Sequence, residues 1–110
     1  MLPLKSSRGF ETFVVDQLAD LGEVTPKRMF GGVGLYCDGL FFAIIARDEL
    51  YLKTDDTTRG DYEAVGAPAF KPYPDRPGTM RYHRVPVDVL ESVPELLRWA
   101  RTAVTVARRA

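Results

Sequence analysis

One part of the chain is most informative about its structure: RMFGGVGLY at residues 28–36, the pair Asp38-Gly39, and LFFAIIA at residues 40–46. Asp-Gly between two apolar runs is a strong signal for a tight hairpin turn. The block at 40–46 is apolar at every position, so we place it centrally in a sheet with most of both faces covered. The glycines at 31–34 would weaken an isolated strand, which indicates a bulge or a close backbone approach there.

Further strands are predicted on the C-terminal side of this hairpin. Leu50 and Leu52 alternate with Tyr51 and Lys53, which is the period of a strand with two different faces. Residues 79–85 alternate in the same way, and Pro86 ends that pattern. Between these strands, four prolines at 67–78 predict a restrained loop around one short edge strand near Phe70.

Two helices are predicted before and between the strands. The first has an apolar face, with Ser6 or Ser7 as its cap and Gly22 as its end; the apolar residues are Phe10, Phe13, Val14, Leu18 and Leu21. The second is short, is capped by Asp55 or Asp56, and runs through Val65 with Tyr62 and Val65 facing inward.

The closing helix has the clearest signals. A single helical turn at 87–90 precedes it, and Ser92-Val93-Pro94-Glu95 is a capping box with proline in the first turn. An apolar stripe then continues to the C-terminus. The pattern as a whole predicts an α+β domain in which a curved antiparallel meander is packed by an N-terminal and a C-terminal helix.

The composition is that of an ordinary globular protein, with 45% apolar and 27% charged residues over 110 positions. This length fits one domain, 1–110. Fifteen basic residues balance fifteen acidic ones, and because proteins that grip DNA phosphates usually carry a positive excess, we expect no direct DNA binding. One cysteine, no N-terminal apolar segment and no apolar run near ~20 residues fit a cytoplasmic protein that does not associate with a membrane.

Side chains that could perform chemistry are few. Nothing in their spacing brings Cys37 and His83 together as a thiol–imidazole dyad. Zinc sites need three or four ligands drawn mainly from Cys and His, so we expect no metal. The glycines at 31–34 fit neither a dinucleotide fingerprint nor a phosphate loop, because the spacing is wrong and no helix follows. We therefore predict a domain that is not an enzyme and holds no cofactor.

The best candidate for a functional surface is a set of basic and aromatic residues on the predicted strands. We predict an interaction patch formed by Lys27, Arg28, Tyr51, Lys53, Tyr82 and Arg84. Such a patch would accept an acidic partner or an anionic ligand. The alternative is a polar outer sheet face with aromatic cross-strand pairs.

The closing helix offers two further surfaces. Its polar face carries Arg98, Arg101 and Arg108, for which a solvated face that complements the helix dipole is the simpler interpretation and DNA binding the alternative. Trp99 lies at the edge of the apolar stripe. Packing into the core and contact in a homodimer are the two interpretations of this residue.

Three motifs, in this order, resemble those of a known family. They are RMFGG with GLY at residues 28–36, LYLK at residues 50–53 and YHRVP at residues 82–86, followed by PELLRWA at residues 94–100. Together they resemble the N-terminal domain of the TfoX/Sxy competence regulators, from about Phe10 to Ala107. The resemblance implies an α+β fold with a curved antiparallel sheet packed by helices.

The resemblance also implies a biological context. Regulators of this family are bacterial cytoplasmic proteins linked to the transcriptional control of DNA uptake. They are understood to act with the cyclic-AMP receptor protein at promoters and not as enzymes, and no catalytic residues are associated with them. Full-length regulators have a second, helical domain, whereas this chain ends at Ala110. We therefore expect a stand-alone N-terminal domain.

Two functions follow as hypotheses. The first is a non-enzymatic regulatory or protein-interaction domain that binds another protein, such as part of the transcription machinery, through the predicted patch and forms a homodimer. The second is a small-molecule-binding domain or an enzyme that holds an anionic ligand with the same residues. A deep concave pocket lined by those side chains would favour the second hypothesis, and a flat or convex face would count against it.

Overall fold

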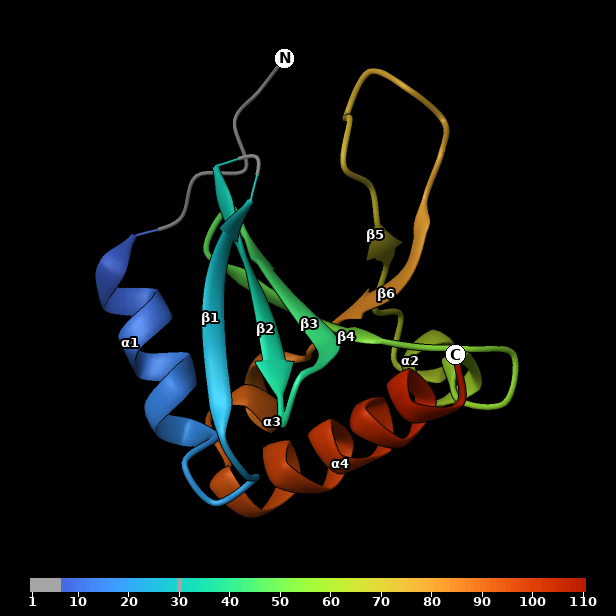
Figure 1. The fold of residues 1–110 in the computed structure, drawn as a ribbon. Helices are drawn as coiled ribbons and strands as arrows, with labels where there is room; N and C mark the ends of the chain where they lie inside the picture. The colour runs from blue at the N-terminus through green and yellow to red at the C-terminus, as the bar shows by residue number, and fades with distance from the viewer. Residues whose placement is uncertain (1–6, 30) are drawn as a thin grey trace.

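Six strands form one antiparallel sheet in the order β1-β2-β3-β4-β6-β5 in the computed structural model, which describes residues 7–29 and 31–110 (Figure 1). The first four make a meander, after which the chain forms the edge strand β5 and returns as β6 beside β4. The strands are β1 (Val24–Met29), β2 (Gly32–Cys37), β3 (Leu40–Ala46), β4 (Glu49–Lys53), β5 (Ala69–Phe70) and β6 (Met80–Arg84). The predicted α+β fold is confirmed.

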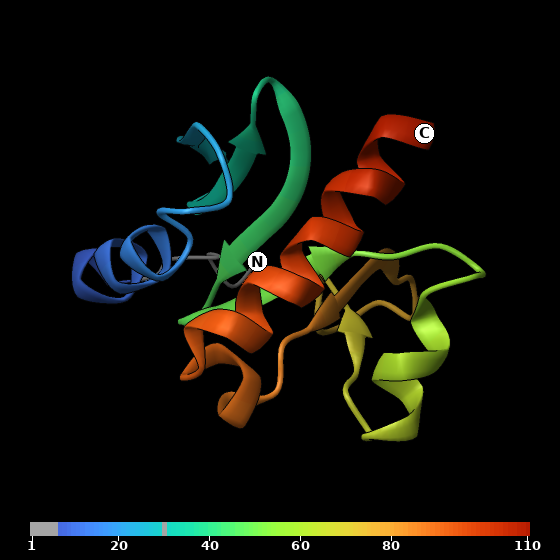
Figure 2. The same cartoon turned by 90° about the horizontal axis from the view of Figure 1, so that it is seen from below.

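Within the described residues, four helices accompany the sheet: α1 (Arg8–Gln17), α2 (Arg59–Ala64), α3 (Val87–Leu90) and α4 (Val93–Arg109). Figure 2 shows α4 crossing one face of the sheet, with α1 farther to one side. We call this helix-covered face the inner face and the opposite one the outer face. The main core lies between the inner face and the helices, and it includes Val14, Leu18, Leu35, Phe42, Ile45, Leu50, Leu52, Leu96 and Ala100.

Two predicted caps within the described residues are confirmed and a third is wrong: α2 begins after Thr58, which makes no side-chain capping hydrogen bond, and Asp55 instead accepts hydrogen bonds from the amides of residues 57 and 58 in the turn before the helix. The Ser7 side chain accepts a hydrogen bond from the Phe10 amide, and the Ser92 side chain accepts one from the Glu95 amide. Ser6, the other candidate cap, and Phe30 of the first motif lie outside the described residues. In the range 7–29 and in 31–110, none of the helices has the length and apolar character needed to cross a bilayer.

Two helix ends differ from the prediction. Helix α1 ends at Gln17, before Leu18, although Leu18 is still fully buried. Helix α2 ends at Ala64, and Val65 is wrongly predicted to face inward, because its side chain is 59% exposed. Gly66 follows with φ +73°, a left-handed conformation that suits glycine and turns the chain away from the helix.

The turns of the β2–β3 and β3–β4 hairpins contain residues with left-handed backbone conformations. Asp38 and Gly39 have φ values of 50° and 85°, as the predicted tight turn requires. Arg47 and Asp48 have φ values of 52° and 58°, which side-chain-bearing residues rarely adopt. The Arg47 guanidinium donates hydrogen bonds to the carbonyl oxygens of residues 71 and 72, at 3.4 and 3.2 Å. This turn therefore also fastens the segment that joins β5 to β6.

A β-bulge between β2 and β3 sets the direction of two phenylalanines. Tyr36 pairs with Phe41 and Leu35 pairs with Ala43, so Phe42 is the extra residue. Phe42 is fully buried in the main core, whereas Phe41 packs on the outer face. The bulge is predicted at the glycines of 31–34, but Gly34 pairs regularly with Ile44 and the extra residue lies on β3, opposite Leu35 and Tyr36.

Candidate functional site

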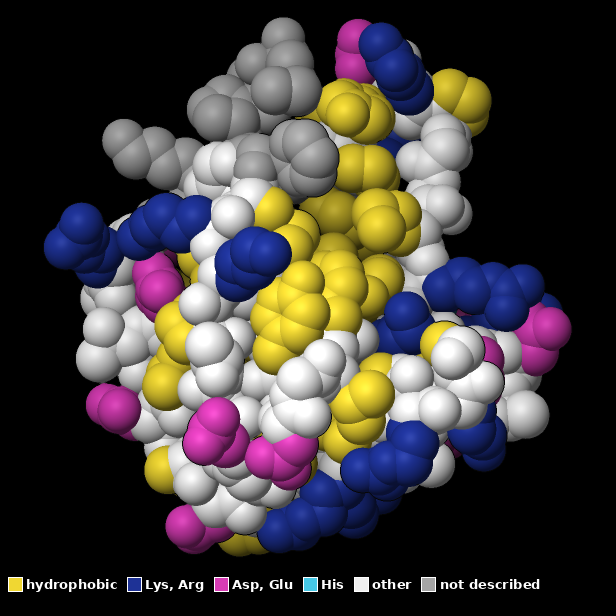
Figure 3. All heavy atoms as spheres, viewed as in Figure 1, with side chains coloured by type: hydrophobic (Ala, Val, Ile, Leu, Met, Phe, Trp, Pro, Cys, Tyr) yellow, Lys and Arg dark blue, Asp and Glu magenta, His cyan; other side chains and the backbone are white. Residues whose placement is uncertain are grey.

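The outer face of the sheet carries a second apolar cluster. Its members are Phe41, Ile44, Ala46, Tyr51, Phe70 and Tyr82. All of them lie on strands, and within the described residues no helix contributes to this cluster. Figure 3 shows hydrophobic side chains gathered on this face between the β1–β2 hairpin and the segment that joins β5 to β6. The cluster is therefore an apolar layer that no described helix covers, in which Phe41 is partly exposed and the other five side chains are at most 8% exposed.

The strand register places Lys27 and Arg84 at opposite ends of one row of residues across the outer face. Lys27 lies opposite Gly34, which lies opposite Ile44; Ile44 lies opposite Tyr51, and Tyr51 opposite Arg84. Residues directly opposite in an antiparallel ladder point to the same face. This row of the outer face therefore begins with the cation Lys27 on β1 and ends with the cation Arg84 on β6, and the residues between them carry no charge.

Aromatic rings form a second line across the same face. Tyr36 stacks on Phe41 with 5.0 Å between ring centroids, and Phe41 lies 5.6 Å from Tyr82. The Lys53 ammonium lies 5.2 Å from the centre of the Tyr82 ring, which is the geometry of a cation–π contact. We call Tyr36, Phe41, Tyr51, Phe70 and Tyr82 the aromatic patch.

The hydroxyl groups of Tyr51 and Tyr82 in this patch are neutral. Burial raises the pKa of Tyr51, and Glu49, which accepts a hydrogen bond from the Tyr51 hydroxyl at 3.2 Å, raises it further. Burial also raises the pKa of Tyr82 to about 12, with a smaller effect of Tyr36. These hydroxyls therefore stay protonated near neutral pH and can donate hydrogen bonds, but they are poorly suited to act as general bases.

The structure divides the predicted interaction patch between the two faces. Lys27, Tyr51, Lys53, Tyr82 and Arg84 share the outer face. Arg28 lies in the neighbouring row with Val33, Ile45 and Leu50, and its guanidinium contacts Glu11 of α1 at 3.3 Å. Arg28 is thus placed on the helix side of the sheet. Whether the other five bind a partner stays a prediction.

Sequence reasoning missed three rings of the aromatic patch, namely Tyr36, Phe41 and Phe70. Phe70 comes from a two-residue edge strand whose pairing with β6 shifts register, which no sequence period reveals. The Tyr51 and Phe70 rings lie 4.7 Å apart. The direction of Phe41 depends on the β3 bulge. Strand alternation combined with the position of this bulge would have placed Tyr36 and Phe41 on the outer face.

Cys37 and His83 lie apart in the sheet. Cys37 is on β2 and His83 on β6, with β3 and β4 between those strands. Burial raises the pKa of the Cys37 thiol, and the nearby Asp38 carboxylate adds to the shift. His83 is buried, and its Nδ1 lies 2.9 Å from the Thr54 hydroxyl oxygen. Among the residues the structure describes, no group of three acids, cysteines or histidines could hold a metal ion.

The buried histidine makes stability depend on pH. Burial lowers the pKa of His83, an effect that Glu63 opposes and Arg59 reinforces. An exposed histidine in the unfolded chain has a pKa of about 6.5, so the unfolded state binds the proton first as the pH falls. We therefore expect the free energy of unfolding to decrease as the pH falls below about 6.5, because the stabilisation from the neutral, buried His83 is then lost.

Urea unfolding at a series of pH values from about 7.5 to 5 would measure this loss. His83 is the sole histidine of the chain, and no other side chain has an ordinary pKa in that range. The His83→Gln variant should therefore lose less stability over the same interval. Identical pH slopes for the two proteins would contradict the assignment.

The arginines of α4 are partly paired. Arg98 contacts Glu95 at 2.8 Å, and Arg109 contacts Asp55 at 3.0 Å. Trp99 packs edge-on against Tyr62, with ring centroids 4.8 Å apart and an interplanar angle of 86°. This contact supports the packing interpretation of Trp99.

Comparison with known proteins identifies the family. A model of the TfoX N-terminal domain matches residues 16–107 of this chain. No curated protein matches it. The match spans the sheet and α4 as far as residue 107, and it includes every residue of the predicted patch and of the aromatic patch. The chain therefore belongs to the TfoX N-terminal domain family.

Proposed function

We propose that this domain is a non-enzymatic regulatory module that binds another protein through the outer face of its sheet. The observation that carries the proposal is the aromatic patch, which lies on strands alone, presents Tyr36 and Phe41 as its partly exposed rings and has Lys27 and Lys53 at its margins. Apolar surfaces rimmed by polar residues mark protein-interaction sites more often than chance. Tyrosine and phenylalanine are also enriched in such interfaces.

The charges of the outer face favour an acidic partner. Among the described residues, neither Lys27 nor Lys53 has a carboxylate within 4.0 Å, whereas Arg84 is paired with Glu49 at 3.4 Å. A partner with carboxylates beside apolar side chains would match this surface. The family resemblance suggests the cyclic-AMP receptor protein or RNA polymerase as the proteins to test first.

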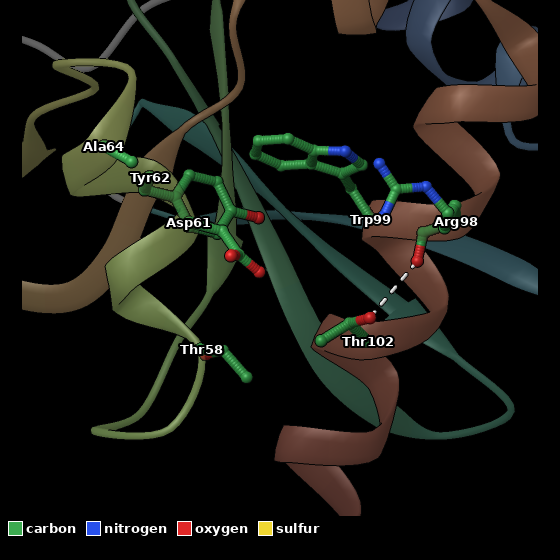
Figure 4. A pocket seen from close by; sticks show the side chains of 7 residues that line it. All are labelled: Thr58, Asp61, Tyr62, Ala64, Arg98, Trp99 and Thr102. Carbon is green, nitrogen blue, oxygen red and sulfur yellow. Dashed lines mark hydrogen bonds between the residues drawn. The ribbon is translucent and has the colours of Figure 1, made fainter.

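Cavities lined by described residues border α2 and α4, away from most of the predicted patch, and Figure 4 shows the one between these two helices. Three of them have volumes of about 230, 350 and 320 Å³. Lys53 is the one residue of the predicted patch that lines any of these three. The cationic and aromatic residues of the outer face do not converge in them, as an enclosed ligand site would require.

Reversing two charges should test the proposal. We expect the Lys27→Glu/Lys53→Glu variant to bind a bacterial cyclic-AMP receptor protein or RNA polymerase at least about ten-fold more weakly than the wild type, because both cations would then repel an acidic partner. Biolayer interferometry at physiological salt would measure this. Because both side chains reach solvent, the melting temperature should change by less than about 5 °C.

The matched control reverses two exposed arginines on α4. Arg101→Glu/Arg108→Glu changes the net charge by the same amount on the helix side of the sheet, so it should leave binding unchanged. An equal loss in both variants would indicate dependence on net charge alone and would contradict the outer-face site. Absence of binding by the wild-type domain to either protein would overturn the proposed transcriptional partner.

A further inference from the structure

The segment that joins β5 to β6, residues 71–79, projects from the sheet beside the outer face (Figure 1). We call it the arm. Every residue of the arm except Pro72 is exposed, so the arm adds little to the core. Hydrophobic side chains nevertheless continue from the outer face along it (Figure 3). Two large ones are exposed here: Tyr73 in the arm and Met80 at its end, at 39% and 40%.

The tip of the arm is a preformed turn. The Tyr73 carbonyl oxygen accepts a hydrogen bond from the Arg76 amide at 3.0 Å, which closes a β-turn with Pro74 at its second position, where proline is favoured. The Arg76 guanidinium lies 4.8 Å from the centre of the Tyr73 ring, the geometry of a cation–π contact. Further prolines occupy positions 72 and 77 and restrict the backbone on both sides. The turn therefore presents the Tyr73 ring to solvent before any partner binds.

One arginine of the β3–β4 turn holds the base of the arm. The Arg47 guanidinium donates to the carbonyl oxygens of residues 71 and 72, and among the described residues these are the only hydrogen bonds that join the arm to the rest of the molecule. Arg47 has φ +52°, and its Nε is buried without a hydrogen-bond partner among those residues. Both features cost free energy, and the exposed arm offers no core packing in return. Local strain of this kind clusters at binding and switch segments.

The charge of the arm has the same sign as the margins of the outer face. Lys71 and Arg76 outnumber Asp75, so the arm has one net positive charge. In the described part of the chain, neither cation has a carboxylate within 4.0 Å. Lys27 and Lys53 are unpaired in the same sense. An acidic partner would therefore meet cations both on the sheet and along the arm.

We propose that the arm is a recognition element whose Tyr73 ring enters an apolar pocket, rimmed by acidic residues, on the protein that binds the outer face. This inference rests on the proposed function and extends its surface beyond the sheet. Tyrosine is frequent among the residues that dominate binding energy, because it offers a large contact area and loses few rotamers. A ring already held by Pro74 and Arg76 loses less freedom still on binding. Arg47 is then a positioning residue that acts through the arm.

Biolayer interferometry with a bacterial cyclic-AMP receptor protein and with RNA polymerase, the two proteins proposed as partners of the outer face, tests the role of Tyr73. We expect Tyr73→Ala to bind at least about ten-fold more weakly than the wild type. The matched control is Phe13→Ala on α1, because Phe13 is equally exposed, at 39%, but lies on the helix side of the sheet. This control should bind as the wild type does.

A second variant tests the positioning role of Arg47. Arg47→Gly removes the hydrogen bonds to the arm, while glycine suits the left-handed backbone at this position. The melting temperature should therefore stay within about 5 °C of the wild type. Amide hydrogen exchange in the arm should become faster, and affinity should fall about five-fold, because the partner must then order the arm. Arg47→Lys keeps a donor for the two carbonyl groups and should recover part of the affinity.

The outcomes separate this inference from the proposed function. If the wild type binds and Tyr73→Ala binds equally well, or Phe13→Ala loses as much affinity, the arm is not a recognition element, although the outer face can still be the site. If Tyr73→Ala is weakened but Lys27→Glu/Lys53→Glu is not, the arm is supported and the outer-face site is contradicted. Full affinity in Arg47→Gly would overturn the positioning role. A wild-type domain that binds neither protein would overturn both proposals.

Discussion

Replacing Phe42 by alanine is expected to lower the free energy of unfolding by about 3–5 kcal/mol. The Phe42 side chain is 0% exposed and lies in the main core, where a truncated ring leaves a cavity that the close-packed interior fills only in part. Such a loss is a large share of the ~5–15 kcal/mol that stabilises a typical domain. Urea unfolding monitored by circular dichroism would measure it.

The neighbouring residue supplies the matched control. Phe41 is only partly buried on the outer face, where its ring contacts Tyr36 and Tyr82. Phe41→Ala should therefore cost less stability, about 1–3 kcal/mol for two lost aromatic contacts, but should weaken binding of the protein partner. Equal stability losses in the two variants would contradict the assignment of Phe41 and Phe42 to opposite faces.

This pair also marks the point at which sequence patterning fails. On β3, Ala46 and Ile44 face the outer side of the sheet. If simple alternation continued toward the start of the strand, Phe42 would also face outward and Phe41 would face inward. The bulge inserts one residue and reverses the direction of both rings. A single insertion moves every side chain beyond it to the other face. The apolar block at 40–46 identifies the strand but contains no local signal for the bulge.

Local chemistry was predictable where a residue interacts with its own neighbours. The Ser7 and Ser92 caps and the Asp38-Gly39 turn each depend on atoms within a few residues, and each is confirmed. The face taken by Arg28 depends instead on how β1 pairs with β2. The three charged residues at 47–49 interrupt the apolar pattern and so indicate a turn, but nothing local predicts that Arg47 donates hydrogen bonds to carbonyl groups more than twenty residues away.

Gly34→Ala is expected to destabilise the domain by about 1–3 kcal/mol, the usual cost of overpacking. A Cβ atom at Gly34 would lie 2.5 Å from the terminal methyl of Met29 and 3.0 Å from the Phe41 ring. The end of the methionine chain can move aside. The phenylalanine ring is held between two tyrosines at 5.0 and 5.6 Å, so it can yield only by disturbing the aromatic patch. Urea unfolding and near-ultraviolet circular dichroism would record both effects.

A glycine elsewhere provides a control of opposite sign. Gly60 lies in α2 with open space around its Cβ position, so Gly60→Ala should raise stability by up to about 1 kcal/mol through helix propensity. The Met29→Ala/Gly34→Ala variant removes the nearer contact and should recover part of the loss, while the contact with Phe41 remains. If Gly34→Ala proved as stable as the wild type, the close packing of Met29 and Phe41 over β2 would be wrong. If it were unstable yet kept full affinity for the partner, the aromatic patch would not be the binding surface. Gly34→Ala therefore tests whether a partner recognises the packing arrangement of the rings on the outer face, since the substitution changes that arrangement without removing any ring.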